Sequence, residues 1–125
     1  MPYKPRGYPD LSPYLLVRDA ERALRFVEAV FGAERLRVIA REGGGIMHAE
    51  ARIGDGVVMM GETPHGPDGN VHVYVADVDA AFARARAAGG RAIQEPGREK
   101  DDPDYRGGIA DGNGTVWWIS RQVEG

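Results

Sequence analysis

Two short segments of the chain carry side chains that are well suited to binding or proton transfer, and in both of them polar and apolar residues alternate. One segment reads His48-Ala49-Glu50-Ala51-Arg52-Ile53, and the other reads Asn70-Val71-His72-Val73-Tyr74-Val75. Successive side chains of a β-strand point to opposite faces. The alternation therefore predicts two strands, each with one polar face and one apolar face.

The polar faces of these strands allow two interpretations. His48, Glu50 and His72 would supply two imidazoles and a carboxylate, a ligand set that suits a divalent metal ion. Alternatively, His48 and Glu50 pair with each other or with Arg52 in a partly hydrated interior. Three polar residues on two strands need not meet, so the second interpretation is favoured. The third histidine, His65, lies in a proline-rich segment and is expected to be solvated.

The elements that position these residues follow from periodicity and from turn residues. In the first half we predict strands at 11–17, 34–41, 46–53 and 57–61, with a helix that begins after Asp19 and ends at Gly32. In the second half we predict strands at 70–75, 91–95, 107–111 and 115–120. A second helix begins after Asp77 or Asp79 and runs to Ala88. A charged loop is predicted at 96–106.

The two halves repeat one pattern. A constant shift of 58 residues relates Val17 to Val75, Asp19 to Asp77, Gly32 to Gly90 and Gly54 to Gly112. Strand ends, helix caps and turn glycines coincide without a gap, which predicts a duplicated βαβββ unit in an α+β fold. A chance coincidence of turn glycines is the alternative.

Composition limits the class of protein. A length of 125 residues fits one domain, and a net charge of −3 gives no basic excess for binding nucleic acid. No apolar run is long enough to span a membrane. The chain has no cysteine, which excludes disulfides and fits a cytoplasmic location.

Several segments resemble a known family. Ser12-Pro13-Tyr14-Leu15-Leu16-Val17, His48-Ala49-Glu50, Val75-Ala76-Asp77-Val78-Asp79-Ala80 and Asp111-Gly112-Asn113-Gly114-Thr115-Val116-Trp117-Trp118-Ile119 are similar to the PhnB-like branch of the glyoxalase/bleomycin resistance protein/dioxygenase (vicinal oxygen chelate) superfamily. The resemblance extends from Tyr8 to Arg121. It implies a single domain, 1–125, with two βαβββ modules at about 8–62 and 70–121 that form a curved mixed-sheet cup. It also implies a homodimer. It does not imply one activity, because the superfamily contains isomerases, lyases, dioxygenases and drug-binding proteins.

The resemblance also locates the positions at which metal-dependent relatives carry their ligands. These positions are Ser12, Met60, Asn70 and Trp118, with Met59 in place of Met60 if the register slips by one residue. Tryptophan has no lone pair to donate, and methionine is a soft ligand. We therefore expect no metal cofactor at these positions. A single divalent ion held by His48, Glu50 and His72 remains the alternative.

The predicted cup has a largely apolar and aromatic lining, which is typical of a small-molecule pocket. The residues expected to bind a ligand are Tyr14, His48, Glu50, Met60, His72, Tyr74, Arg106 and Trp118. Arg106 either binds an anionic group of the ligand or pairs with Asp102 or Asp104.

Three functions remain open. The first is metal-free binding of a small organic molecule, with sequestration or resistance as its use. The second is a metal-dependent lyase, isomerase or dioxygenase of the glyoxalase type, so whether the chain is an enzyme stays undecided. The third is a dimeric accessory protein in which side chains such as Trp118 and Met60 fill the cup.

Overall fold

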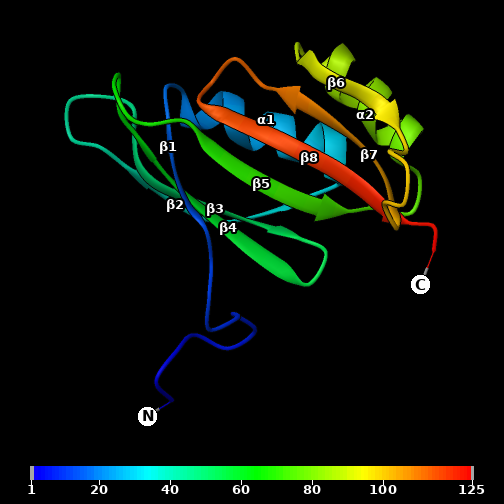
Figure 1. Ribbon diagram of the computed structural model, residues 1–125. Helices are drawn as coiled ribbons and strands as arrows, with labels where there is room; N and C mark the ends of the chain where they lie inside the picture. The colour runs from blue at the N-terminus through cyan, green and yellow to red at the C-terminus, as the bar shows by residue number, and fades with distance from the viewer. Residues whose placement is uncertain (1, 125) are drawn as a thin grey trace.

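The computed structural model describes residues 2–124, which form eight strands and two helices in two four-stranded sheets (Figure 1). The first module contains β1 (Tyr14–Val17), α1 (Ala20–Phe31), β2 (Glu34–Ala40), β3 (Ile46–Ile53) and β4 (Gly56–Glu62). The second contains β5 (Gly69–Tyr74), α2 (Val78–Ala87), β6 (Arg91–Gly97), β7 (Asp104–Ala110) and β8 (Thr115–Gln122).

The two sheets share one topology. Their strand orders are β1-β4-β3-β2 and β5-β8-β7-β6, and in each sheet the first strand runs parallel to the fourth while the other pairs are antiparallel. This arrangement of two βαβββ units confirms the predicted α+β fold class.

Aspartate caps start both helices, as the sequence predicted. The Asp19 carboxylate accepts a hydrogen bond from the Arg22 backbone N–H, and α1 ends at Gly32 in the left-handed conformation, with φ of 65°. In α2 the Asp77 carboxylate accepts from the Ala80 backbone N–H, so Asp77 rather than Asp79 is the cap.

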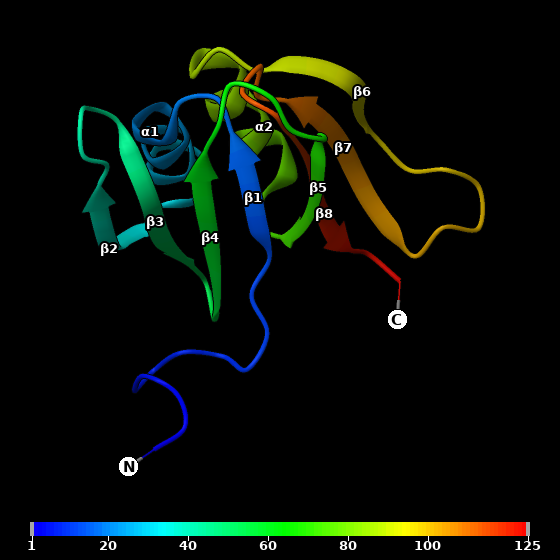
Figure 2. The same ribbon diagram turned by 90° about the vertical axis from the view of Figure 1, so that its left-hand side faces the viewer.

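One core joins the inner faces of both sheets to the helices. It contains Ala49, Ala51 and Met60 from the first sheet and Ile109, Trp117 and Ile119 from the second. Figure 1 looks onto the second sheet with the helices behind it, and Figure 2 looks onto the first sheet with α1 behind it. The opposite face of each sheet, which we call its outer face, therefore points away from the common core.

The gapless repeat is interrupted by one extra residue, which precedes the last strand of the second module. Glu50 of β3 pairs with Met59 of β4, whereas Gly108, its counterpart in β7, pairs with Trp118 of β8. The shift is thus 58 residues for the third strands and 59 for the fourth. The turn between β7 and β8 contains the extra residue.

This change of register corrects the prediction for Met60. Met60 lies opposite Ala49 and is 0% exposed, so it belongs to the core and not to a ligand-binding face. Val58 is buried in the same core. Met59 occupies the outer-face position.

Some strand limits also differ from the prediction. β7 begins at Asp104, because β8 continues to Gln122 and supplies it with a partner there. With β6 extending to Gly97, the predicted loop at 96–106 shortens to 98–103. β1 begins only at Tyr14, after Pro13, which has no N–H to donate to a strand ladder.

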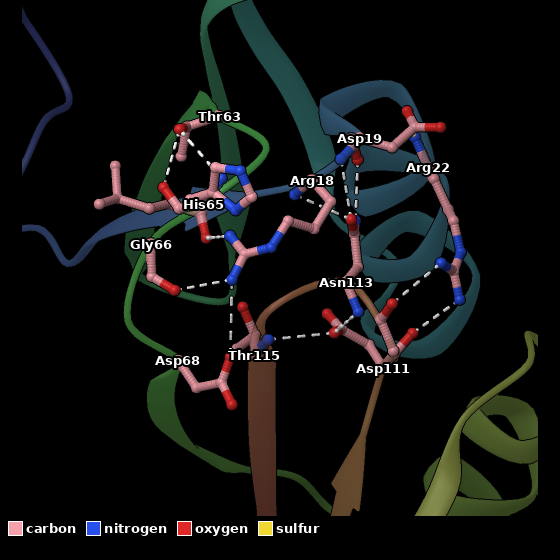
Figure 3. A network of polar contacts seen from close by, with 12 residues as sticks. Arg18, Asp19, Arg22, Thr63, His65, Gly66, Asp68, Asp111, Asn113 and Thr115 are labelled. Atoms are coloured by element: carbon pink, nitrogen blue, oxygen red, sulfur yellow. Dashed lines mark hydrogen bonds and ion pairs between the residues drawn. The ribbon is translucent and has the colours of Figure 1, made fainter.

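The turn with the extra residue connects the modules (Figure 3). The Asn113 side-chain oxygen accepts hydrogen bonds from the Arg18 and Asp19 backbone N–H groups at 3.1 and 2.8 Å, and its amide donates to the Asp19 carbonyl at 2.8 Å. The Arg22 guanidinium donates to the carbonyls of Asp111 and Gly112. The last turn of module two therefore holds the start of α1 in module one.

Candidate functional site

The outer face of the first sheet carries a row of polar side chains that starts at Tyr14 on β1 and crosses to β3. Tyr14 is 52% exposed, whereas Glu50 is only 3% exposed although it lies on the face away from the core. His48 lies between them. As predicted from the alternation, Ala49 and Ala51 point into the core instead.

These side chains form a chain of hydrogen bonds. His48 Nε2 lies 2.7 Å from Glu50 Oε2, and the Tyr14 hydroxyl lies 3.4 Å from His48 Nδ1. The rings of Tyr14 and His48 have centroids 5.7 Å apart. The other carboxylate oxygen of Glu50 accepts from the hydroxyl of Tyr8. His48 and Glu50 therefore pair with each other, as one of the two sequence interpretations expected.

The contacts around Glu50 set its ionisation. Burial raises the pKa of a carboxyl, but the hydrogen bonds from His48 and Tyr8 outweigh burial, so the pKa of Glu50 is lowered from its ordinary value of 4.5. The hydrogen bond between Tyr8 and Glu50 also raises the pKa of the Tyr8 phenol. An ionised Glu50 can only accept, so Nε2 of His48 carries a proton and donates it. In this tautomer Nδ1 carries a lone pair, which faces Tyr14.

Tyr8 belongs to the N-terminal arm, and the sequence interpretation did not include it in the site. The arm is held beside β3 by this contact and by a hydrogen bond of 2.9 Å from Arg52 to the Gly7 carbonyl. The contact between Tyr8 and Glu50 spans 42 residues. No local pattern in the arm signals it, because the arm forms no regular element.

The outer face of the second sheet carries aromatic side chains. The rings of His72 and Tyr74 meet edge to face, with centroids 4.6 Å apart, and the Tyr74 hydroxyl donates to Asp104 at 3.1 Å. Trp118 donates from its indole nitrogen to the side-chain oxygen of Asn70 at 3.0 Å. The carboxylate of Asp104 raises the pKa of Tyr74 through this hydrogen bond.

Arg106 lies on the same sheet and is engaged by acidic neighbours. Its guanidinium forms an ion pair with Asp102 and lies 3.8 Å from a carboxylate oxygen of Asp104. Of the two roles considered for Arg106, the structure shows the ion pair.

The residues proposed for the alternative metal site lie on different sheets. His48 and Glu50 are on β3, whereas His72 is on β5 beside Tyr74. Among residues 2–124, no three acidic or histidine side chains are grouped so that they could hold a metal ion. Two of the four positions implied by the family, Asn70 and Trp118, hydrogen-bond to each other.

Two grooves lie near β5. The larger, of about 660 Å³, lies between the modules and is lined by residues that include Phe31, Val57, Val71 and Val73. The smaller, of about 530 Å³, lies where β5 and β8 end and is lined by Tyr74, Pro103, Asp104 and Arg121 among others. Tyr74 lines both grooves.

Comparison with known proteins gives a consistent assignment. The family model described as Glyoxalase/Bleomycin resistance protein/Dioxygenase superfamily matches residues 11–119. An uncharacterized protein of Mycobacterium bovis is 32% identical over 129 residues, covering 92% of this chain and 84% of the relative.

Solved structures agree with this match. TioX from Micromonospora sp. ML1 superimposes with a TM-score of 0.75 at 27% identity, covering 92% of this chain and 99% of TioX. The PhnB protein from Bacillus cereus superimposes with a TM-score of 0.69 at 16% identity, covering 90% of this chain and 99% of that one, and supports the fold alone. Within residues 2–124, no helix is long and apolar enough to cross a membrane.

Proposed function

Because this chain belongs to the glyoxalase/bleomycin resistance protein/dioxygenase superfamily, we propose that it binds a small aromatic or amphipathic organic molecule without the help of a metal ion. The ligand contacts the outer faces of the sheets, and sequestration of the bound compound is the use we propose for this binding. The protein acts as a homodimer in the cytoplasm.

The observation that carries this proposal is the hydrogen bond between Trp118 and Asn70. These residues occupy two positions at which the family resemblance expects metal ligands, and each uses its polar group on the other at 3.0 Å. In module one the corresponding strand position is Met59, a soft ligand. The donor set at these positions therefore does not fit the hard or borderline cations that carboxylate and imidazole ligands select.

Exposed aromatic side chains supply the surface for an organic ligand. Tyr14 is 52% exposed and Tyr74 is 63% exposed, each on the outer face of its sheet. Covering apolar surface on binding is favourable by about 25 cal/mol per Å² before ordering costs are subtracted. Flat ligands gain further from stacked or edge-to-face contacts with such rings.

Metal analysis and ligand binding together test the proposal. The protein is purified without chelators or a metal-affinity tag, its metal content is measured, and binding of 8-anilinonaphthalene-1-sulfonate is followed by fluorescence before and after treatment with EDTA. We expect substoichiometric metal and binding that EDTA does not change. Stoichiometric metal whose removal abolishes binding would contradict the metal-free proposal, and a folded protein that does not bind the probe would contradict the ligand class.

A further inference from the structure

We propose that the outer face of the first sheet binds a molecule with a phenolic or enolic hydroxyl and that His48 accepts the proton of that hydroxyl. The inference rests on the proposed function, because it specifies the ligand class of a binding face. It assigns His48 as the proton acceptor, Tyr14 as the second contact to the hydroxyl, and Glu50 as a positioning residue.

The position of Glu50 is the first reason. A carboxylate that is 3% exposed is costly unless it is paired and hydrogen-bonded. Glu50 is satisfied by His48 on one oxygen and by Tyr8 on the other. The arrangement fixes the imidazole in the tautomer with the proton on Nε2, and it stabilises the imidazolium that forms when Nδ1 gains a proton.

The second reason is the contact between His48 and Tyr14. Their polar atoms are 3.4 Å apart, longer than the usual hydrogen bond from a hydroxyl, so the contact is weak. A ligand hydroxyl that lies beside both atoms accepts from Tyr14 and donates to Nδ1. The exposed ring of Tyr14 offers an apolar surface next to this position.

The proton transfer balances within the site. The O–H bond of the ligand breaks, its electron pair stays on the ligand oxygen, and the proton forms an N–H bond at His48 Nδ1. The Tyr14 hydroxyl then donates to the ligand oxyanion, and the Glu50 carboxylate lies against the imidazolium at 2.7 Å. No oxidant or other reactant is required.

Two arginines near the site favour the anionic form of the ligand, and the imidazolium of His48 offsets the charge of Glu50 once the proton has moved. Arg37 on β2 and Arg52 on β3 are close enough to act electrostatically on Tyr8, and Arg37 also acts on Glu50. Glu34 on β2 offsets part of this charge, since it lies 3.8 Å from Arg52. Beside these groups the face presents Tyr14 from β1 and Met59 from β4.

A matched pair of probes tests the inference. In 4-nitroanisole a methyl group replaces the hydroxyl proton of 4-nitrophenol, and the absorbance of the bound phenol reports its ionisation. We expect the wild-type protein to bind the phenol roughly tenfold more tightly than the ether, which is within the range expected when a polar group is left without a partner. His48→Gln should reduce this ratio to near unity, whereas His65→Gln, a change in an exposed loop, should leave it unchanged.

Further variants separate the roles of the residues. Glu50→Gln should lower the phenolate fraction of the bound probe, an effect that a purely structural residue would not produce. If His48→Gln does not fold, Tyr14→Phe is measured instead. This change at an exposed position removes the second contact to the ligand hydroxyl and should also reduce the ratio of phenol to ether binding. Equal binding of both probes to the wild type, or an unchanged ratio in a folded His48→Gln variant, would overturn this inference while leaving small-molecule binding intact. If the folded protein binds none of the three compounds, namely 4-nitrophenol, 4-nitroanisole and the anilinonaphthalene sulfonate, the proposed function itself is overturned.

Discussion

Trp117 and Trp118 are neighbours in β8 with opposite surroundings, because successive side chains of a strand point to opposite faces. Trp117 is 1% exposed, stacks on Phe26 of α1 and donates its indole N–H to Asp111. Trp118 lies on the outer face and bonds to Asn70. One side chain belongs to the core, and the other is available to a ligand.

The two tryptophans should therefore respond differently to replacement by alanine. Trp117→Ala is expected to lower the free energy of unfolding by about 3–5 kcal/mol, as for other large buried aromatics. Trp118→Ala should leave the protein folded and weaken binding of the anilinonaphthalene sulfonate by about 1–3 kcal/mol. Chemical denaturation and fluorescence titration measure the two effects. Unchanged binding in a folded Trp118→Ala variant would remove Trp118 from the site.

The ionisation of Glu50 gives a prediction for pH. Its pKa is lowered in the folded protein, so its stabilising contribution is fully present above the ordinary value of 4.5 and is lost as the pH falls through the folded value. The difference in unfolding free energy between the wild type and Glu50→Gln should shrink as the pH falls below about 4.5, where the carboxylate begins to gain its proton. Urea denaturation at each pH measures it. A difference that does not shrink below about pH 4.5 would show that the carboxylate is not held in its ionised form.

At the scale of elements, strand alternation and helix caps could be predicted from the sequence because both depend on neighbouring residues. The polar face of β3 and the Asp19 cap are as expected. The change of register was hidden, because Gly54 and Gly56 align with Gly112 and Gly114 although the second turn is longer by one residue. Met60 was misplaced for that reason.

The contacts that complete the candidate site could not be predicted from the sequence, for a different reason. Tyr8 meets Glu50 across 42 residues, and neither the arm nor β3 has a periodicity that records the contact. Arg106 was compatible with a ligand or with an ion pair, and only its distance to Asp102 and Asp104 decides between them. Side-chain pairs between distant segments depend on how the elements pack.

The turn between β7 and β8 gives a test at this scale. Asn113→Ala removes the acceptor of the Asp19 N–H group, whereas the Arg18 N–H keeps a bond of 3.2 Å to the backbone carbonyl at position 113. A donor left without a partner inside the fold costs about 1–3 kcal/mol. We expect a loss of that order or more in the free energy of unfolding. Asp55→Ala, at an exposed position of the shorter turn between β3 and β4, is the control and should change stability little. Equal effects of the two changes would show that Asn113 does not join the modules.

For the whole molecule, the unpaired sheet edges and the exposed outer faces favour association with a second chain. Within the described residues, the edge strands β1 and β2 of the first sheet and β5 and β6 of the second each pair on one side only, so both edges of each sheet are unpaired. Unpaired edges and exposed aromatic residues such as Tyr14 and Tyr74 favour association with another chain. Light scattering at micromolar concentration should give the mass of a homodimer. A monomer mass under these conditions would contradict the prediction and leave each outer face to bind its ligand alone.

The bonds of Asn113 also have a consequence for synthesis. A chain emerges from the ribosome with its N-terminus first, and Asn113 follows Arg18 by 95 residues. Until it arrives, the backbone N–H groups of Arg18 and Asp19 have only water as an acceptor. We therefore expect a translation product that stops before this turn to be cleaved by proteases near the start of α1 more readily than a chain that contains the turn.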